Sequence, residues 1–139
     1  MARICEMAGN RGVMAWSPDE RQALIAEAVG PLQVELYVAD LASGAIRCIT
    51  AGQPPARYAF AHWTERGLFL LSDRPHERGA LCRLDVESAA LSPLVTADAH
   101  PDQGELELLA VSGDGKQAAY TSNHEGYGQL WGMDLETSA

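Results

Sequence analysis

The segment Leu36-Tyr37-Val38-Ala39-Asp40-Leu41 decides the fold, because its pattern occurs three times along the chain. Its counterparts are Leu81–Val86 and Leu130–Leu135, and each copy reads Leu, three variable residues, Asp, and then Leu or Val. The aspartates of the three copies lie 45 and 49 residues apart, and each copy runs into a small polar turn. Repetition at such a period is the signature of a repeat architecture.

Two further elements repeat around this segment. Upstream, Ala15–Glu20 corresponds to His62–Gly67 and to Ala110–Gly115, at spacings of 47 and 48 residues. Downstream, an apolar segment occurs as Ile46–Thr50 and as Leu91–Thr96, and its third copy is missing. Each full period therefore contains four short apolar segments.

Four short strands in a period of this length indicate the blade of a β-propeller, which is a four-stranded antiparallel sheet. In the third strand of each copy, alternate residues are apolar, as in Cys82, Leu84 and Val86. A blade lies between two neighbours, so both of its faces can be buried. We predict an all-β fold, a partial propeller of about three blades over residues 1–52, 53–97 and 98–139. The last blade is expected to lack its outer strand.

One segment favours a helix when it is taken alone. Ser17-Pro18-Asp19-Glu20 is a good helix capping box, and strong helix formers follow it in Arg21–Val29. The corresponding positions of the other copies are Leu68–Leu71 and Gln117–Tyr120, which suit a strand. We therefore predict a strand after Glu20, with the repeat register overriding the local signal.

The composition excludes several classes of protein. The chain has 10 basic and 19 acidic residues and a net charge of −9, which disfavours binding to nucleic acid or to an anionic membrane. It has no long apolar run and no secretory signal at Met1. Its three cysteines, Cys5, Cys48 and Cys82, fit neither a disulfide framework nor a metal knuckle. They are expected to be reduced and mostly buried, which points to the cytoplasm.

The repeats resemble a known family. Trp16-Ser17-Pro18-Asp19, Leu36–Gly44 and the Ile-Thr ending at Thr50 resemble the TolB-like propeller repeat. In the second half, Leu71–Arg74 and Gly79–Asp85 resemble a blade of the prolyl oligopeptidase family, especially its acylaminoacyl and dipeptidyl peptidase branch. Glu105–Lys116 and Ala119–Tyr127 continue that likeness. Glu20 stands where the repeat usually has Gly, and Gly113 where it usually has Pro, so only turn geometry is put in doubt.

The resemblance implies a role. In that family an N-terminal propeller caps an α/β-hydrolase domain that carries a Ser-Asp-His triad, and the propeller restricts which substrates reach it. The implied function is a non-catalytic propeller fragment of a serine peptidase. It would gate peptide substrates and pack on a hydrolase domain that is absent from this chain. The alternative is a TolB-like scaffold that binds a protein or peptide. A self-sufficient enzyme is a third, less favoured hypothesis.

The candidate chemical groups are given structural roles. Ser112 lacks the Gly-x-Ser-x-Gly pattern of a nucleophile elbow. His62 is expected to be packed or hydrogen-bonded, and His76 and His124 to lie in solvated loops between second and third strands. None of these, nor His100, has metal-ligand spacing to another His or Cys. We predict no catalytic, cofactor-binding or metal-binding residue.

The remaining polar and aromatic repeats are also read as structural. Asp98–Glu105 is interpreted as a linker between blades rather than a calcium loop. The three repeated aspartates (Asp40, Asp85 and Asp134) are expected to accept hydrogen bonds from turn amides. The three tryptophans (Trp16, Trp63 and Trp131) are expected in the core or between blades. An incomplete propeller exposes blade faces and strand edges, so we expect the isolated polypeptide to be marginally stable, to self-associate, or both; two chains could close a six-bladed ring.

Overall fold

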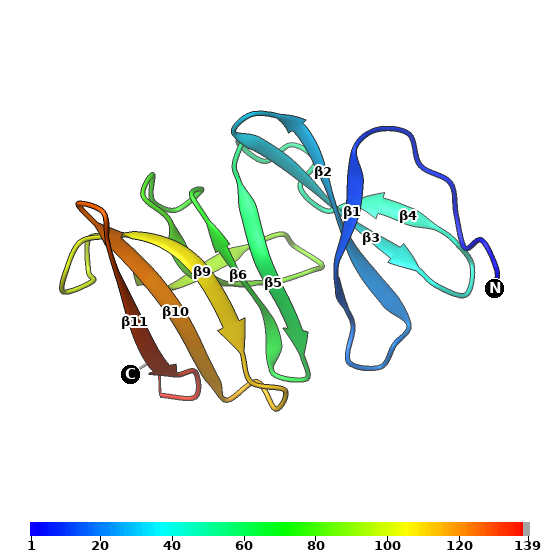
Figure 1. The fold of residues 1–139 in the computed structure, drawn as a ribbon. Coiled ribbons are helices and arrows are strands. Elements are labelled where there is room, and N and C mark those ends of the chain that lie inside the picture. Colours follow the sequence, from blue (N-terminus) through cyan, green and yellow to red (C-terminus); the bar gives the residue numbers. More distant parts are fainter. Residues whose placement is uncertain (138–139) are drawn as a thin grey trace.

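The computed structural model describes residues 1–137 and consists of three antiparallel sheets and no helix in that range (Figure 1). Blade 1 is β1 (Arg11–Trp16), β2 (Gln22–Gly30), β3 (Gln33–Asp40) and β4 (Ile46–Cys48). Blade 2 is β5 (Tyr58–Thr64), β6 (Gly67–Ser72), β7 (Ala80–Leu84) and β8 (Leu91–Thr96). Blade 3 is β9 (Glu105–Val111), β10 (Gln117–His124) and β11 (Tyr127–Asp134). Ser138 and Ala139 lie outside the described residues.

The sheets have the strand orders β1-β2-β3-β4, β5-β6-β7-β8 and β9-β10-β11. The first strands β1, β5 and β9 are neighbours and form the inner side of the arc, facing the viewer in Figure 1. This arrangement confirms the prediction of an all-β partial propeller whose third blade has three strands. The described residues include no helix that could cross a membrane.

The strand prediction for the segment after Glu20 is confirmed, since it forms β2. The Ser17 side chain accepts a hydrogen bond from the Gln22 amide (2.8 Å) and donates one to Asp19 (2.6 Å). Ser112 makes the same two bonds, to the Gln117 amide (3.0 Å) and to Asp114 (2.7 Å). The Ser-x-Asp motif therefore caps a hairpin turn here rather than a helix, with the same side-chain chemistry.

The core lies between the blades and consists of two clusters. Strand β6 shows why, since Leu68 and Leu70 pack against blade 1 while Phe69 and Leu71 pack against blade 3. All four side chains are buried. The two-residue alternation of a strand thus supplies both interfaces of the middle blade. The expectation that both faces of a blade are buried holds for blade 2.

The repeated aspartates hold the turn after each third strand, as predicted. Asp40 accepts hydrogen bonds from the Ala42 and Ser43 amides. Asp85 accepts the equivalent hydrogen bonds from the amides of residues 87 and 88, and Asp134 accepts them from the amides of residues 136 and 137. These amides lower the pKa of Asp40 and of Asp85 below the usual value of a carboxyl group. The repeated acid therefore holds the turn in each of the three blades.

The outer blades each have an open face, and this corrects one prediction. Trp63 and Trp131 pack against the two core clusters, as expected. Trp16 occupies the same position in blade 1 as Trp63 in blade 2, yet it is 56% exposed. Trp16 pairs with Ala23, on the face of blade 1 that is turned away from blade 2. Among the described residues no blade lies on that side, so Trp16 is neither in the core nor between blades, contrary to the prediction.

Candidate functional site

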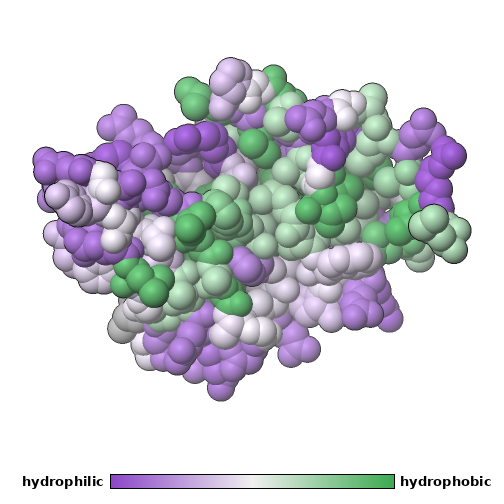
Figure 2. All heavy atoms as spheres, viewed as in Figure 1, coloured by the Kyte–Doolittle hydropathy of each residue, from purple (hydrophilic) through white to green (hydrophobic). Residues whose placement is uncertain are grey.

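An exposed aromatic residue distinguishes the inner side of the arc. Phe60, on β5, is 43% exposed and has a positive φ of 54°. It lies in a β-bulge, where the register of β5 on β6 shifts between Ala59 and His62. A bulge turns a side chain away from the ordinary pleat, and positive φ is strained for a bulky residue. Figure 2 shows hydrophobic residues gathered in the middle of this face, over the inner strands.

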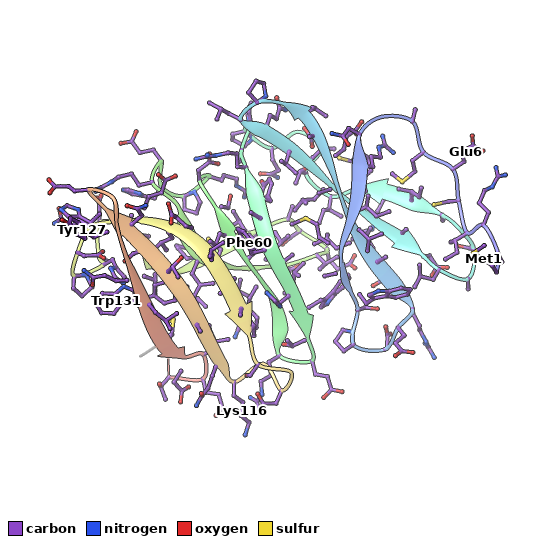
Figure 3. The ribbon with its side chains drawn as sticks, viewed as in Figure 1. Met1, Glu6, Phe60, Lys116, Tyr127 and Trp131 are labelled. Atoms are coloured by element: carbon purple, nitrogen blue, oxygen red, sulfur yellow. The ribbon has the colours of Figure 1, made fainter. Side chains whose placement is uncertain are left out.

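Phe60 borders an open cleft of about 430 Å³ between blades 2 and 3 (Figure 3), which we call the Phe60 cleft. Its apolar lining comes from both blades and includes Leu71, Leu106 and Leu108. The loop between β6 and β7 closes one side, where the Arg78 carbonyl accepts a hydrogen bond from the Leu106 amide (3.3 Å). The cleft is therefore formed only where two blades meet.

Charged residues form the rim of the Phe60 cleft. Asp73 accepts two hydrogen bonds from Arg57, from the backbone amide and from Nε, both at 2.7 Å. Glu105 lies 3.9 Å from the same guanidinium. Glu107, also in the lining, accepts a hydrogen bond from the Asn123 side-chain amide (3.0 Å). The lining thus contains three carboxylates and one guanidinium, so the rim has a negative balance.

The serine and histidines singled out from the sequence do not come together. Ser112 is engaged in its hairpin turn. His62 forms a hydrogen bond between Nε2 and the Leu109 carbonyl (3.1 Å), which links blades 2 and 3 and confirms its expected packing role. His124 is exposed at the end of β10, as expected for the loop between second and third strands.

His76 differs from the expectation of a solvated loop residue. Its Nε2 lies 2.8 Å from Asp98, which also pairs with Arg78. Only 19% of its side chain is exposed. The hydrogen bonds from His76 and Arg78 lower the pKa of Asp98. His76 therefore ties the β6–β7 loop to the linker after β8.

Sequence reasoning missed a buried polar network in the linker between blades 2 and 3. The His100 ring contacts Asp102 through Nδ1 (2.6 Å), and Asp102 also accepts hydrogen bonds from the Ser122 hydroxyl and the Gly104 amide. The Trp131 indole donates to Ser122 (2.8 Å). The hydrogen bond from Ser122, with smaller contributions from Gly104 and His100, lowers the pKa of Asp102 to about 2.

This network contains Ser, His and Asp but has the wrong order for a catalytic triad. In a triad the histidine lies between the serine and the acid and takes the serine proton. Here Asp102 lies between His100 and Ser122, and Ser122 is completely buried. The network anchors the linker to β10 and β11. The interpretation of Asp98–Glu105 as a linker agrees with the place of residues 98–104 between β8 and β9, while Glu105 begins β9.

The cysteines are free thiols, but they are less buried than expected. Cys82 is buried, and burial raises the pKa of its thiol to about 12. Cys5 and Cys48 are half-buried. Within residues 1–137, no three His, Cys, Asp or Glu side chains are grouped so that they could hold a metal ion.

The fold defines the class of protein, an open arc of a β-propeller similar to those of TolB proteins. Putative TolB from Agrobacterium tumefaciens superposes with a TM-score of 0.70 at 16% identity, over 91% of this chain and 46% of its own. Puromycin hydrolase gives 0.69 at 22% identity, over 90% of this chain and 20% of its own. One of two structurally analysed prolyl endopeptidases superposes with a TM-score of 0.69 at 14% identity, over 87% of this chain and 17% of its own.

At these identities the likeness establishes the fold. The chain spans less than half the length of each of these structures. No protein-family model matches the sequence, and no curated protein matches it. The expected resemblance to TolB propellers and to the propellers of prolyl oligopeptidase-like enzymes is confirmed at the level of structure.

Proposed function

We propose that this chain is a non-catalytic propeller segment that admits peptide substrates to the α/β-hydrolase domain of a prolyl oligopeptidase-like serine peptidase. The observation that carries the proposal is the Phe60 cleft, because it offers a peptide an exposed aromatic ring between two blades. Backbone strain held at an exposed residue is typical of functional positions. The likeness to puromycin hydrolase and to a prolyl endopeptidase supports the kind of enzyme.

The chemistry of the cleft indicates which peptides fit. The apolar lining favours an apolar side chain, and the negative rim formed by Asp73, Glu105 and Glu107 favours a cationic group next to it. A free peptide amino terminus followed by an apolar residue satisfies both requirements. The proposal therefore predicts preference for unblocked peptides over the same peptides with an acetylated amino terminus.

Binding of a fluorescent octapeptide with a free amino terminus and a leading Leu-Phe tests this function. Phe60→Gly is the informative variant, because glycine tolerates the observed φ and the change removes only the ring. Loss of an aromatic contact is expected to weaken binding about tenfold or more. The matched control is Leu32→Gly, another exposed apolar residue, in the β2–β3 turn and outside the lining of the cleft. Equal binding by the wild type and Phe60→Gly contradicts the proposal.

The TolB-like scaffold is the second candidate function. It is favoured by the Agrobacterium structure, of which this chain covers 46%, against 20% of puromycin hydrolase. The coding DNA on both sides of this reading frame distinguishes the two. A downstream Gly-x-Ser-x-Gly followed by Asp and His supports the peptidase segment. A reading frame that continues through further blade repeats to a stop codon supports the scaffold function and contradicts the gating role.

A further inference from the structure

Blade 3 ends in an open face and an open edge. On this face Leu130 is 77% exposed, and Ala119 pairs with Ala110 on one side and Gly132 on the other. This row of small residues borders a hollow of about 600 Å³. Among the described residues, β11 has β10 along one edge and no strand along the other. Such an edge presents unpaired backbone groups, which favour addition of another strand.

The two complete blades show what an outer strand does. In blade 1, Ile49 follows β4 and is buried in the cluster between blades 1 and 2. Arg47, on β4, donates to the Val86 carbonyl (3.2 Å) and pairs with Glu87 (3.1 Å). Val86 and Glu87 belong to the turn after β7. An outer strand therefore completes its own blade and also contacts the turn between the third and fourth strands of the next blade.

The N-terminal segment makes the equivalent contact with blade 1. A Cβ atom added at Gly44, in the turn between β3 and β4, would lie 2.5 Å from the Ile4 carbonyl oxygen and 3.9 Å from the Cys5 side chain. Further on, Gly9 approaches the Glu27 carboxylate on the open face of the same blade. In Figure 1 this segment runs beside blade 1, on the side away from blade 2. It thus occupies the place of an outer strand of a preceding blade.

The sequence of this segment partly resembles β4 and the residues after it. Arg3-Ile4-Cys5 and Ala8-Gly9-Asn10 share the arginine and the Ala-Gly pair with Arg47-Cys48-Ile49 and Ala51-Gly52-Gln53, but the isoleucine and cysteine are in the opposite order and one additional residue lies between the two parts. Ala23, Ile25 and Ala39 are buried on the open face of blade 1, although the described residues include no blade on that side.

We propose that, in the isolated 139-residue polypeptide, residues 2–8 form the outer strand of blade 3 in a second copy, and that two copies exchange these strands to close a six-bladed ring. Each copy then presents the face of blade 1, with the exposed Trp16, to the hollow beside Gly132 in its partner. These contacts between copies would be of the same kind as the contacts between neighbouring blades inside one chain. One copy matches just under half of the Agrobacterium structure, so two copies supply about one full set of blades.

Two copies joined head to tail through two identical interfaces close a ring if each copy forms half of that ring. The N-terminal segment and β11 lie at opposite ends of the arc, so one chain cannot pair them with each other (Figure 1). The net charge of −9 per chain opposes association, and salt screens that repulsion. The dimer should therefore strengthen as salt is raised.

Sedimentation equilibrium of the 139-residue chain tests the proposal. We expect the mass of two chains, and the mass of one chain after Leu130→Asp or after deletion of residues 2–8. Leu32→Asp, a similarly exposed leucine away from both open faces, should remain dimeric. Gly132→Trp fills the hollow without a charge and should also give monomers, with circular dichroism showing that each variant is folded. A monomeric wild type, or an open-ended polymer, overturns the proposal.

Cross-linking locates the contact. With Cys48→Ser and Gln129→Cys, a short bifunctional maleimide should join Cys5 of one chain to residue 129 of the other. The expected product is a covalent dimer. A dimer that forms equally well without Gln129→Cys, or no product from a dimeric wild type, contradicts strand exchange. The outcome is independent of peptide binding, so it is distinguishable from failure of the gating function.

Discussion

Replacing Glu20 with glycine should stabilise the protein. Glu20 has a φ of 60° in the turn between β1 and β2. The equivalent residue in blade 3 is Gly115, with a φ of 69°, and the two turns share the same hydrogen bonds. Glu20 is therefore a side chain in a conformation that its own repeat assigns to glycine.

The magnitude follows from two opposing effects. A left-handed conformation costs a residue with a Cβ about 1–2 kcal/mol. Glycine loses more chain entropy on folding, which reduces the stabilisation by about 0.4–1 kcal/mol. Because Glu20 is exposed, little packing is lost, and the net gain in the free energy of unfolding is about 0.5–1 kcal/mol. For a chain of this length that corresponds to a rise in Tm of about 2–3 °C.

Urea denaturation followed by tryptophan fluorescence measures the gain, at one protein concentration for all variants. Glu20→Ala is the matched control, because it removes the same charge but keeps the Cβ atom. Gly115→Ala should be destabilising, since its new Cβ would collide with Thr64 of blade 2. If Glu20→Ala stabilises as much as Glu20→Gly, the backbone explanation is refuted and the effect belongs to the charge.

Three further predictions concern buried groups. The pKa of Asp102 is lowered to about 2 from 3.8, so the stability that this carboxylate contributes is present above pH 3.8 and is lost as the pH falls towards 2. Asp102→Asn should flatten that part of the acid denaturation curve. A curve unchanged by the substitution argues against this contribution. Ser122→Ala removes a partner from Asp102 and from Trp131 and should lower the free energy of unfolding by about 1–3 kcal/mol in urea, whereas a neutral effect means the network is not formed. Cys82 should react with a thiol reagent only after unfolding, and after the other two cysteines; early reaction contradicts its burial.

The fold could be predicted because three repeats of the sequence encode the same blade structure. Ser17-Pro18-Asp19-Glu20 alone favours a helix, since a helix cap and a Ser-x-Asp hairpin turn satisfy backbone amides with the same side chains. The equivalent residues after Ser112 have no helical pattern, and their turn is the same. Repetition thus settled what local propensity leaves ambiguous.

The repeat predicts a position in the blade but not the surroundings of that blade. Trp16 and Trp63 have equivalent sequence positions, yet Trp63 packs on blade 1 and Trp16 is exposed, because burial depends on the neighbour and not on the residue. The same reasoning makes the open face of blade 1 informative. An aromatic that is packed in one repeat and exposed in the next marks a surface suited to a further blade.

The candidate site was beyond sequence reasoning because it arises where the repeat is broken. Ala59-Phe60-Ala61 reads as ordinary alternation, and only the register shift on β6 turns Phe60 outward at a positive φ. Asp102 and Ser122 are 20 residues apart, and the linker that brings them together has no periodicity. A β-bulge changes the direction of one side chain without changing the composition of its strand, so its position has to be observed. In a repeat protein, the departures from the repeat are therefore the first places to test for function.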